Sequence, residues 1–459
     1  VFADREPTPG EIDEEPTPPS TAVSVAIEPH FVPDPVMALR EQSRTAVPAR
    51  RGFRAPRTVT GPPPADPADP ASAAGSMDVA ASAEWSAAAD LVARRLAADG
   101  LAATAVRAMA ATRAATEAAG LDAEAMAAGL AGIGLPVDLL AFVALPGGAA
   151  AAAASDADTD ADTDTDAARE ARSRAWIAAA LARLEAGEDP DALATAAAAL
   201  PVEIRPSIPG FRAAADDGGE PLALLRVQPT RGRYWAGRGG GGSLDLAVSL
   251  LESLPDLAFV LSIGSPFVPD ALDRMAPARE RARGRVTVVD EPHVVSQWAQ
   301  DNGQPGFVAG DDRPWLLAPR YASRGDFGST FVPGDTWLVE GLPAAGIAVA
   351  RSPLLFQGGN LLVAADPRDP ARRLLLLGDT EVDRNVALGL SREAIIEGFR
   401  REFGVDRVAV LQPPAFHLDF AATVRRLPAT DDQPARSVAF VHDEDRGHAM
   451  VLEAGIRRL

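Results

Sequence analysis

Three short segments in the C-terminal half of the chain combine residue types that can hold a cation and move protons. They are QWAQDNG (residues 297–303), FQGGNLLV (356–363) and FHLDF (416–420), each beside the end of an expected strand. In an extended stretch, His417 and Asp419 point to one face while Leu418 between them points towards a core. The spacing therefore pairs a general acid or base with a carboxylate.

A second carboxylate, Asp301, directly follows a Trp-Ala-Gln turn after the strand expected at residues 286–289. Loops at strand ends commonly carry functional residues, so Asp301 and Asp419 could face one cleft. A guanidinium suits two such carboxylates because it is planar, permanently charged and offers its donors in a fixed fork. The segments therefore predict a ligand that carries a guanidinium group.

The charge balance favours a cationic ligand and argues against nucleic acid as a partner. Acidic residues outnumber basic ones 64 to 44, for a formal net charge of -20, and the basic residues are all arginine. They are spread among acidic residues instead of forming a basic block, so the chain repels phosphate backbones. No apolar run is long enough to span a bilayer, so we expect a soluble protein without a membrane partner. Composition identifies neither its compartment nor its oligomeric state.

The elements that must position these residues belong to the last of five expected regions. Residues 1–75 are rich in Pro, Ala, Asp, Glu and Thr and predict a disordered tail. Residues 76–154 are alanine-rich, with breaks at Gly100, Gly120 and residues 132–136, which predicts a bundle of about three helices. An acidic linker at residues 155–167 and a further helical connection at residues 168–217 follow.

Two polar segments allow a second interpretation. The alternating aspartates of residues 155–167 lack the glycine and glutamate placement of an EF-hand loop, so a solvated linker is favoured over a calcium site. The run RGRYWAGRGGGGS (residues 231–243) lacks the lysine and the Ser/Thr of a P-loop at the right place. A flexible connection is therefore favoured over a phosphate-binding loop.

Residues 218–459 alternate short apolar runs with amphipathic stretches and Gly/Pro turns, which is typical of an α/β domain. One helix is expected between Ser391 as N-cap and Gly404 as C-terminal stop, because Ile395, Phe399 and Phe403 form one apolar stripe. We expect strands at residues 222–227, 259–263, 286–289, 347–350, 361–364, 374–377, 408–411 and 438–441.

In their order and spacing, WAQD (residues 298–301), GGNL (358–361) and HLDF (417–420) resemble the motifs of peptidyl-arginine deiminases and their pentein-fold relatives. The resemblance covers residues 218–459, and its most specific part is the pair of WxQD and HxD motifs. It implies an α/β pentein fold, a pseudo-fivefold propeller of ββαβ units. That propeller is partial here and is preceded by the alanine-rich helices and the disordered tail.

The resemblance also assigns roles to single residues. Asp301 and Asp419 would bind the substrate guanidinium, and His417 would protonate the leaving ammonia and later activate water. Three more residues would contribute to substrate binding: Trp298, Gln300 and Asn360. The implied reaction converts arginine within a peptide or protein to citrulline and ammonia, and free arginine or agmatine are the other candidate substrates.

The chain as given contains no cysteine, whereas the mechanism of that family begins with attack of a cysteine thiolate on the guanidinium carbon. In the family this cysteine lies near the end of the domain, well beyond HxD, so we expect an incomplete domain whose missing part supplies the thiolate. One alternative is an inactive pentein that binds arginine side chains. The other is a structural or interaction protein, in which the motifs are core aromatics, a tight turn and a packed histidine.

No cofactor is required by the sequence, and metal ligands stay unassigned. The animal relatives hold calcium near these motifs. The corresponding positions here include Gln300, Gln304 and Leu362, which supply no carboxylate, and calcium prefers anionic oxygen ligands. Calcium is therefore suggested by the resemblance, but its acidic ligands are missing.

Overall fold

The computed structural model describes residues 83–116, 121–144, 166–220, 222, 224–229, 243–254, 256–282, 285–291, 295, 299–320, 339–412, 417–430, 435–442 and 449–451. The tail expected at residues 1–75 lies outside this part of the chain. So do most of the acidic linker and nearly all of the glycine-rich run.

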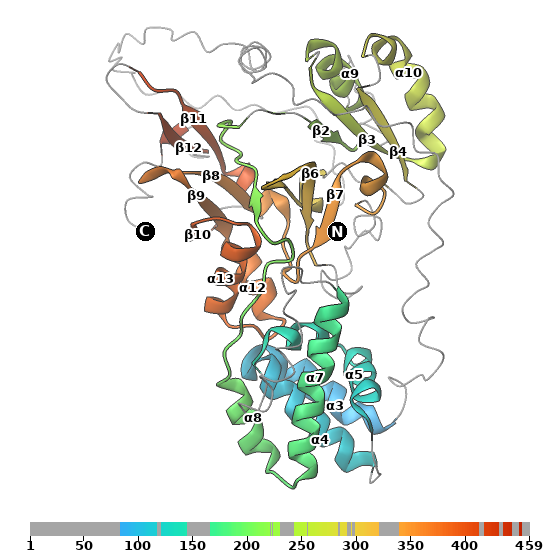
Figure 1. Ribbon diagram of the computed structural model, residues 1–459, viewed down its shortest axis with the longest axis vertical. Coiled ribbons are helices and arrows are strands. Elements are labelled where there is room, and N and C mark those ends of the chain that lie inside the picture. Colours follow the sequence, from blue (N-terminus) through green and yellow to red (C-terminus); the bar gives the residue numbers. More distant parts are fainter. Residues whose placement is uncertain are drawn as a thin grey trace, which may run out of the picture.

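A helical bundle forms the lower end of the molecule in Figure 1. Its sequences are rich in alanine, the strongest helix former. Asp122 and Asp189 cap two of the helices, since their side chains accept hydrogen bonds from the amides of Ala125 and Ala192 at 2.8 and 2.9 Å. The elements are α3 (Ala83–Asp99), α4 (Leu101–Thr116), α5 (Ala123–Gly132), η2 (Val137–Phe142), α7 (Asp166–Glu185) and α8 (Pro190–Ala198).

The strands of the described part form four separate sheets rather than a closed ring. The first has the order β1-β5-β6-β7, with β1 (Phe211–Ala213), β5 (Gln304–Val308), β6 (Asp311–Ala318) and β7 (Ala348–Arg351). The second has the order β10-β9-β8, with β8 (Leu361–Asp366), β9 (Asp369–Gly378) and β10 (Arg407–Leu411). The third joins β11 (Ala422–Leu427), β12 (Arg436–His442) and β13 (Ala449–Val451). The fourth has the order β2-β3-β4, with β2 (Leu224–Val227), β3 (Ala258–Gly264) and β4 (Val286–Glu291).

The β2-β3-β4 sheet is parallel and buried on both faces. Alternate residues of β3, such as Phe259 and Leu261, pack with α9 (Ser243–Ser253) and α10 (Val268–Arg281), which begins after η4 (Ser265–Phe267). On the other face, Val260 packs with the apolar residues of η7 (Leu342–Ala345). Burial on two faces explains why the β3 sequence reads as a nearly continuous apolar run.

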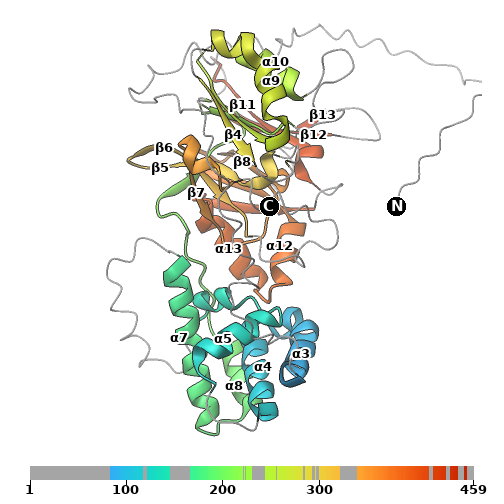
Figure 2. The same cartoon turned by 90° about the vertical axis from the view of Figure 1, so that its right-hand side faces the viewer.

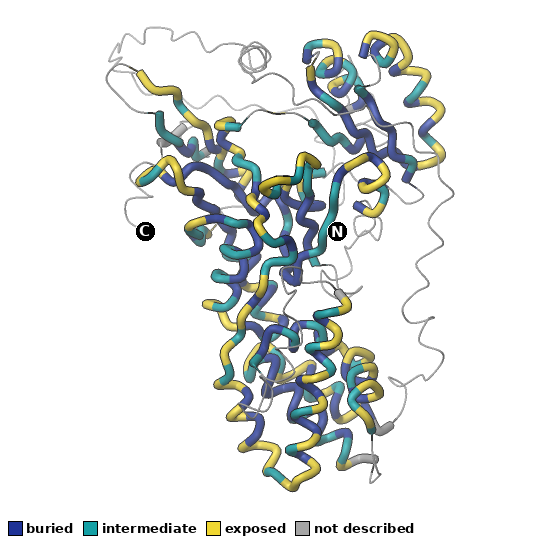
Figure 3. The backbone as a smooth tube through the Cα atoms, in the orientation of Figure 1, coloured by how far each residue is buried: buried dark blue, intermediate teal, exposed yellow. Residues whose placement is uncertain are grey.

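The helices α12 (Asp379–Val386) and α13 (Arg392–Glu402) lie between the sheets and the bundle, as the two views in Figures 1 and 2 show. Figure 3 shows buried residues in the bundle and in the elements next to it, and one apolar cluster joins residues of both parts. The Leu101 amide donates a 2.8 Å hydrogen bond to the Gly389 carbonyl. Gly389 has a φ of +81°, and a Cβ there would lie 2.6 Å from the Leu101 nitrogen, so the turn after α12 requires glycine.

The edge strand β8 is covered by a loop that uses carboxylates in place of a strand. The Asp216 side chain accepts a 2.7 Å hydrogen bond from the Val363 amide, and the Asp217 side chain accepts one of 3.0 Å from the Ala365 amide. The Asp217 carbonyl also accepts from the Arg426 amide of β11 at 2.6 Å. This loop therefore satisfies the open edge of one sheet and ties it to the next.

The expected strands are confirmed as β2, β3, β4, β7, β8, β9, β10 and β12, and the expected helix is confirmed as α13 with Ser391 as its N-cap. The three expected helices at residues 76–154 correspond to α3, α4 and α5. The helices expected only as a connection, α7 and α8, pack into the same bundle core. Within the described residues, no helix combines the length and the apolar character that crossing a bilayer needs.

Candidate active site

Three short 3-10 helices bring the polar segments together. They are η5 (Ala299–Asn302), η8 (Gly358–Asn360) and η9 (Leu418–Phe420); η8 contacts both of the others. Each turn lies just before a strand of a different sheet: β5, β8 and β11. The site is therefore assembled where three sheets approach one another.

Gly359 lies at the centre of this arrangement. Its amide donates a 3.1 Å hydrogen bond to Asp301 Oδ1. A Cβ at this position would lie 2.5 Å from His417 Nδ1 and 3.0 Å from Asp419 Oδ2. Glycine is therefore needed for close approach, and the three residues predicted as catalytic, Asp301, His417 and Asp419, converge around it.

The contacts of His417 assign its tautomer. The Gln357 side chain accepts a 2.8 Å hydrogen bond from Arg384 Nη2 through Oε1, and a guanidinium can only donate. The same oxygen lies 2.9 Å from His417 Nε2, so Nε2 must carry the proton that is donated to it. In the neutral ring, Nδ1 then holds the lone pair, and it lies 3.9 Å from Asp419 Oδ1.

Asn360 is fully buried and acts as a brace within the site. Its side-chain oxygen accepts a 3.1 Å hydrogen bond from the Leu418 amide, between His417 and Asp419. Its side-chain nitrogen donates to Glu381 Oε1 at 2.6 Å and to Thr380 Oγ1 at 3.2 Å. Asn360 was predicted to bind substrate, and the described contacts of its side chain are to Leu418, Glu381 and Thr380.

The η5 turn is fixed from two sides. The Asn302 amide group donates a 3.1 Å hydrogen bond to Gln228 Oε1, and both side chains are buried. Gln300, predicted to bind substrate, is exposed and donates a long 3.4 Å hydrogen bond to the Gly358 carbonyl. Trp298, the third predicted substrate-binding residue, lies outside the described residues.

Burial sets the ionisation of the three central residues. It raises the pKa of Asp301, against the effect of the Gly359 hydrogen bond and the Arg384 charge. It raises the pKa of Asp419 as well, with His417 opposing the shift and Asp301 adding to it. Burial lowers the pKa of His417, with Asp419 opposing and Arg384 adding. A bound cation would favour the ionised carboxylates and so offset their desolvation.

Sequence reasoning missed Gln357, Gly359, Glu381 and Arg384. Gln357 and Gly359 lie inside the quoted segment FQGGNLLV, where the doubled glycine was the available signal. Glu381 and Arg384 lie on α12, and no pattern in the sequence links that helix to the other segments.

The positions considered for calcium have other contacts. The Gln304 side chain donates a 3.2 Å hydrogen bond to the Ala214 carbonyl, and Leu362 packs in an apolar cluster. Within the described ranges, no group of three or more His, Asp or Glu side chains is placed to hold a metal ion.

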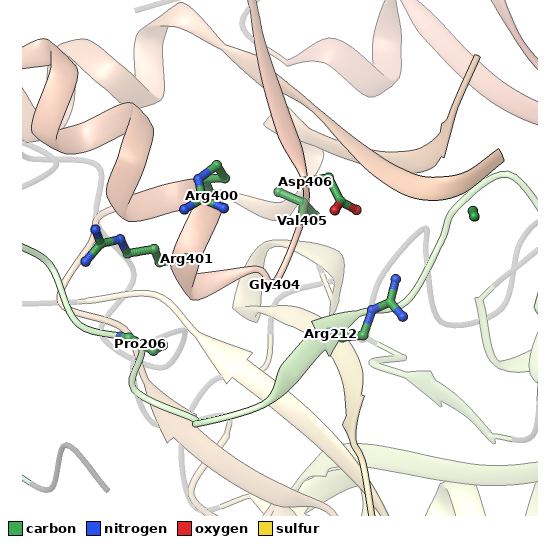
Figure 4. Close-up of a pocket in the computed structure, with 8 residues that line it drawn as sticks. Pro206, Arg212, Arg400, Arg401, Gly404, Val405 and Asp406 are labelled. Carbon is green, nitrogen blue, oxygen red and sulfur yellow. The ribbon is translucent and has the colours of Figure 1, made fainter. Parts of the chain in front are cut away.

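A pocket of about 580 Å³ lies away from this site, near β1 and the C-terminal end of α13 (Figure 4). Arg400 and Arg401 line it, but both guanidinium groups already pair with Glu397, and Arg401 also pairs with Glu203. The lining is Pro206, Arg212, Ala371, Arg400, Arg401, Gly404, Val405 and Asp406, none of which belongs to the three polar segments.

Comparison with known proteins gives partial structural similarities. No protein-family model and no curated protein matches the chain. A solved protein provisionally described as an agmatine deiminase matches with 16% identity and a TM-score of 0.36, over 46% of this chain and 59% of the other. The agmatine deiminase of C. jejuni matches with 11% identity and a TM-score of 0.33, over 46% of this chain and 60% of the other. Each match takes in less than two thirds of the other protein's length.

Proposed function

We propose that Asp301 and Asp419 bind the guanidinium of a substrate and that His417 is the acid and base of a guanidine-hydrolysing site. The observation that carries this proposal is the convergence of the three side chains around Gly359. Two carboxylates that approach a common point repel each other. A planar cation with several donors can bond to both of them. Burial raises the pKa of both aspartates, and a bound cation would favour their ionised forms.

His417 has the tautomer that this role requires. The Nε2 proton is held by Gln357, so Nδ1 carries the lone pair, and it lies 3.9 Å from Asp419 Oδ1. Nδ1 can accept a proton from an attacking group and return it to the leaving ammonia. The overall reaction adds water to the guanidinium carbon and gives a ureido group and ammonium.

The nucleophile is the part of the proposal that these 459 residues do not supply, since they include no cysteine. The motif resemblance points to a pentein-type deiminase in which a thiolate attacks first. We propose arginine within a peptide as the substrate, with free arginine and agmatine as the candidates to compare. The two proposed guanidinium ligands, Asp301 and Asp419, both belong to the described residues, so binding is the step to test first.

Calorimetric titration with N-acetylarginine amide, arginine and agmatine tests the binding step. We expect Asp301→Asn and Asp419→Asn each to weaken binding by about 1.5–3 kcal/mol, because each removes a charge-assisted hydrogen bond. Asp90→Asn, on the exposed face of α3, is the matched control and should leave affinity unchanged. Equal affinity in all three variants would remove the proposed roles.

An assay for citrulline or another ureido product with the same ligands separates turnover from binding. Product that depends on His417 would support the hydrolase. Binding without product would instead favour a protein that holds arginine side chains and does not convert them.

A further inference from the structure

We propose that Glu381 is a positioning residue of this site, holding His417 in its Nε2-protonated form and fixing the His-Leu-Asp segment from behind. The expected effect of Glu381 on ligand affinity rests on the proposed function. Its effect on the tautomer of His417 can be tested without a ligand.

Two hydrogen-bonded paths lead from the Glu381 carboxylate to the same segment. Along the first, Arg384 Nη1 donates to Glu381 Oε2 at 3.2 Å, and Arg384 Nη2 donates to Gln357 Oε1 at 2.8 Å. That oxygen also accepts from His417 Nε2 at 2.9 Å. The path ends on the imidazole and fixes which nitrogen bears its proton.

The second path reaches the backbone beside the imidazole. Asn360 Nδ2 donates to Glu381 Oε1 at 2.6 Å, and Asn360 Oδ1 accepts from the Leu418 amide at 3.1 Å. Each carboxylate oxygen therefore serves a different path. One buried side chain controls both the ring of His417 and the main chain that follows it.

The carboxylate is itself rigidly placed. Glu381 is fully buried on α12. One turn later, the Asn385 side chain accepts from the Leu355 amide at 2.9 Å and donates to the Leu355 carbonyl at 2.8 Å. The helix is thus fixed to the segment that leads into Gln357. A positioning group needs such support, because a loosely held carboxylate would orient nothing.

Glu381 also restrains a cation of the same kind as the proposed ligand. Arg384 lies close enough to Asp301 and His417 for its charge to influence both. Its hydrogen bonds to Glu381 and Gln357 engage two of its nitrogens, Nη1 and Nη2. Without Glu381, the guanidinium of Arg384 could compete with substrate for Asp301 and Asp419.

Replacement by glutamine tests these roles at nearly constant shape. In Glu381 the Oε1 position accepts from Asn360 and the Oε2 position accepts from Arg384. Glutamine replaces one of these two oxygens with an NH2 group, which would face a donor instead of accepting from it. The matched control is Glu397→Gln on α13. Glu397 likewise bonds two partners, Arg400 and Arg401, but at the surface and outside the site.

The experiment is nitrogen NMR of histidine-labelled full-length protein at about pH 8, with the His417 signals assigned from a His417→Ala sample. At this pH the imidazole is neutral and a carboxyl with a pKa of about 7 is ionised. We expect wild type and Glu397→Gln to show Nε2 protonated and Nδ1 bare. In Glu381→Gln, the two nitrogen shifts should move towards the averaged values of a free imidazole.

Binding is measured on the same samples with N-acetylarginine amide and agmatine. We expect Glu381→Gln to weaken binding about tenfold and Glu397→Gln to leave it unchanged. If wild type binds neither ligand while its tautomer is fixed as stated, the proposed function fails and the positioning role stands. A protonated Nδ1 in wild type, or a Glu381→Gln spectrum identical to wild type, would overturn the inference.

A second variant covers the case in which Glu381→Gln does not fold. Arg384→Gln cuts only the first path, so the tautomer should average while hydrogen exchange of the Leu418 amide keeps its wild-type rate. A fixed tautomer in folded Arg384→Gln would contradict the first path directly.

Discussion

Two neighbouring helices carry the same kind of acid–arginine cluster in opposite environments. On α12, Glu381 is fully buried, and burial raises its pKa to about 7 despite its pairing with Arg384. On α13, the side chain of Glu397 is 42% exposed, and hydrogen bonds from Arg400 and then Arg401 lower its pKa to about 2. Access of water decides the sign of the shift, because desolvation opposes charge and well-hydrated pairing does not.

The difference also separates two uses of one residue pair. The exposed cluster binds its own arginines and adds little to the fold, as surface ion pairs generally do. The buried cluster bears an energetic cost that is offset only while all its partners stay in place. That dependence is what makes it suitable for holding a site in one arrangement.

The largest expected effect comes from removing one buried partner. Arg384→Ala leaves the Glu381 carboxylate buried without its cation, and we expect a loss of about 2–3 kcal/mol of unfolding free energy near neutral pH or above. Urea denaturation at about pH 8 and about pH 5 measures it. The loss should shrink at the lower pH, where Glu381 is protonated, and an equal loss at both would contradict the buried-charge explanation.

A second prediction concerns how stability depends on pH. The pKa of Glu381 is raised from 4.5 to about 7. Its contribution to the free energy of unfolding is therefore complete below pH 4.5 and is lost as the pH rises through 7. Glu381→Gln should therefore flatten the stability curve between these values. Glu402 and Glu291 have similarly raised pKa values, so a part of the slope should remain.

Glu397→Gln should act in the opposite window. Because its pKa is lowered to about 2, the contribution of Glu397 to the free energy of unfolding is present above pH 4.5 and is lost as the pH falls towards 2. Denaturant titrations of wild type and both variants across the whole range would show the two windows side by side. If both variants flattened the dependence of stability on pH over the same pH range, the contrast between the buried and the exposed glutamate would be contradicted.

The smallest expected effect is at the exposed cluster. Arg401→Ala removes contacts to Glu397 and Glu203, and we expect a change within about 1 kcal/mol because all three side chains are partly exposed. About 1 M salt should reduce the difference further, whereas the effect of Arg384→Ala should persist. Thermal denaturation at low and high salt measures both.

Apolar pattern predicted the buried elements of the fold well and the polar ones poorly. Strands such as β3 and β9 contain runs of leucine and β-branched residues, which are buried in the sheets. Such continuous apolar runs are typical of strands that are covered on both faces. Strands β5 and β6 were missed because each contains proline, and β11 because Arg425 and Arg426 face solvent in it. A three-residue strand such as β1 is too short for any pattern.

The candidate site was predictable where chemistry depends on spacing. The two-residue separation of His417 and Asp419 and the position of Asp301 after a strand identified the three converging groups. The support behind them was not predictable, because Glu381 and Arg384 reach the segment only through the packing of α12 against Leu355. The contacts of Asn360 show the same limit, since the resemblance assigned it to substrate binding and did not indicate its hydrogen bonds to Leu418 and Glu381.

One continuous apolar cluster runs from the helical bundle into α13, so the unfolding of the two parts should be coupled. Phe356 packs edge to face on Phe399 and Phe403, with ring centroids 6.2 and 5.2 Å apart, in the same cluster that contains Leu101 and Trp176. Neither part can melt without exposing the other to water. Heating should therefore give one cooperative unfolding transition. A fragment that lacks the helical bundle would expose aromatic side chains to water, and we expect it to aggregate.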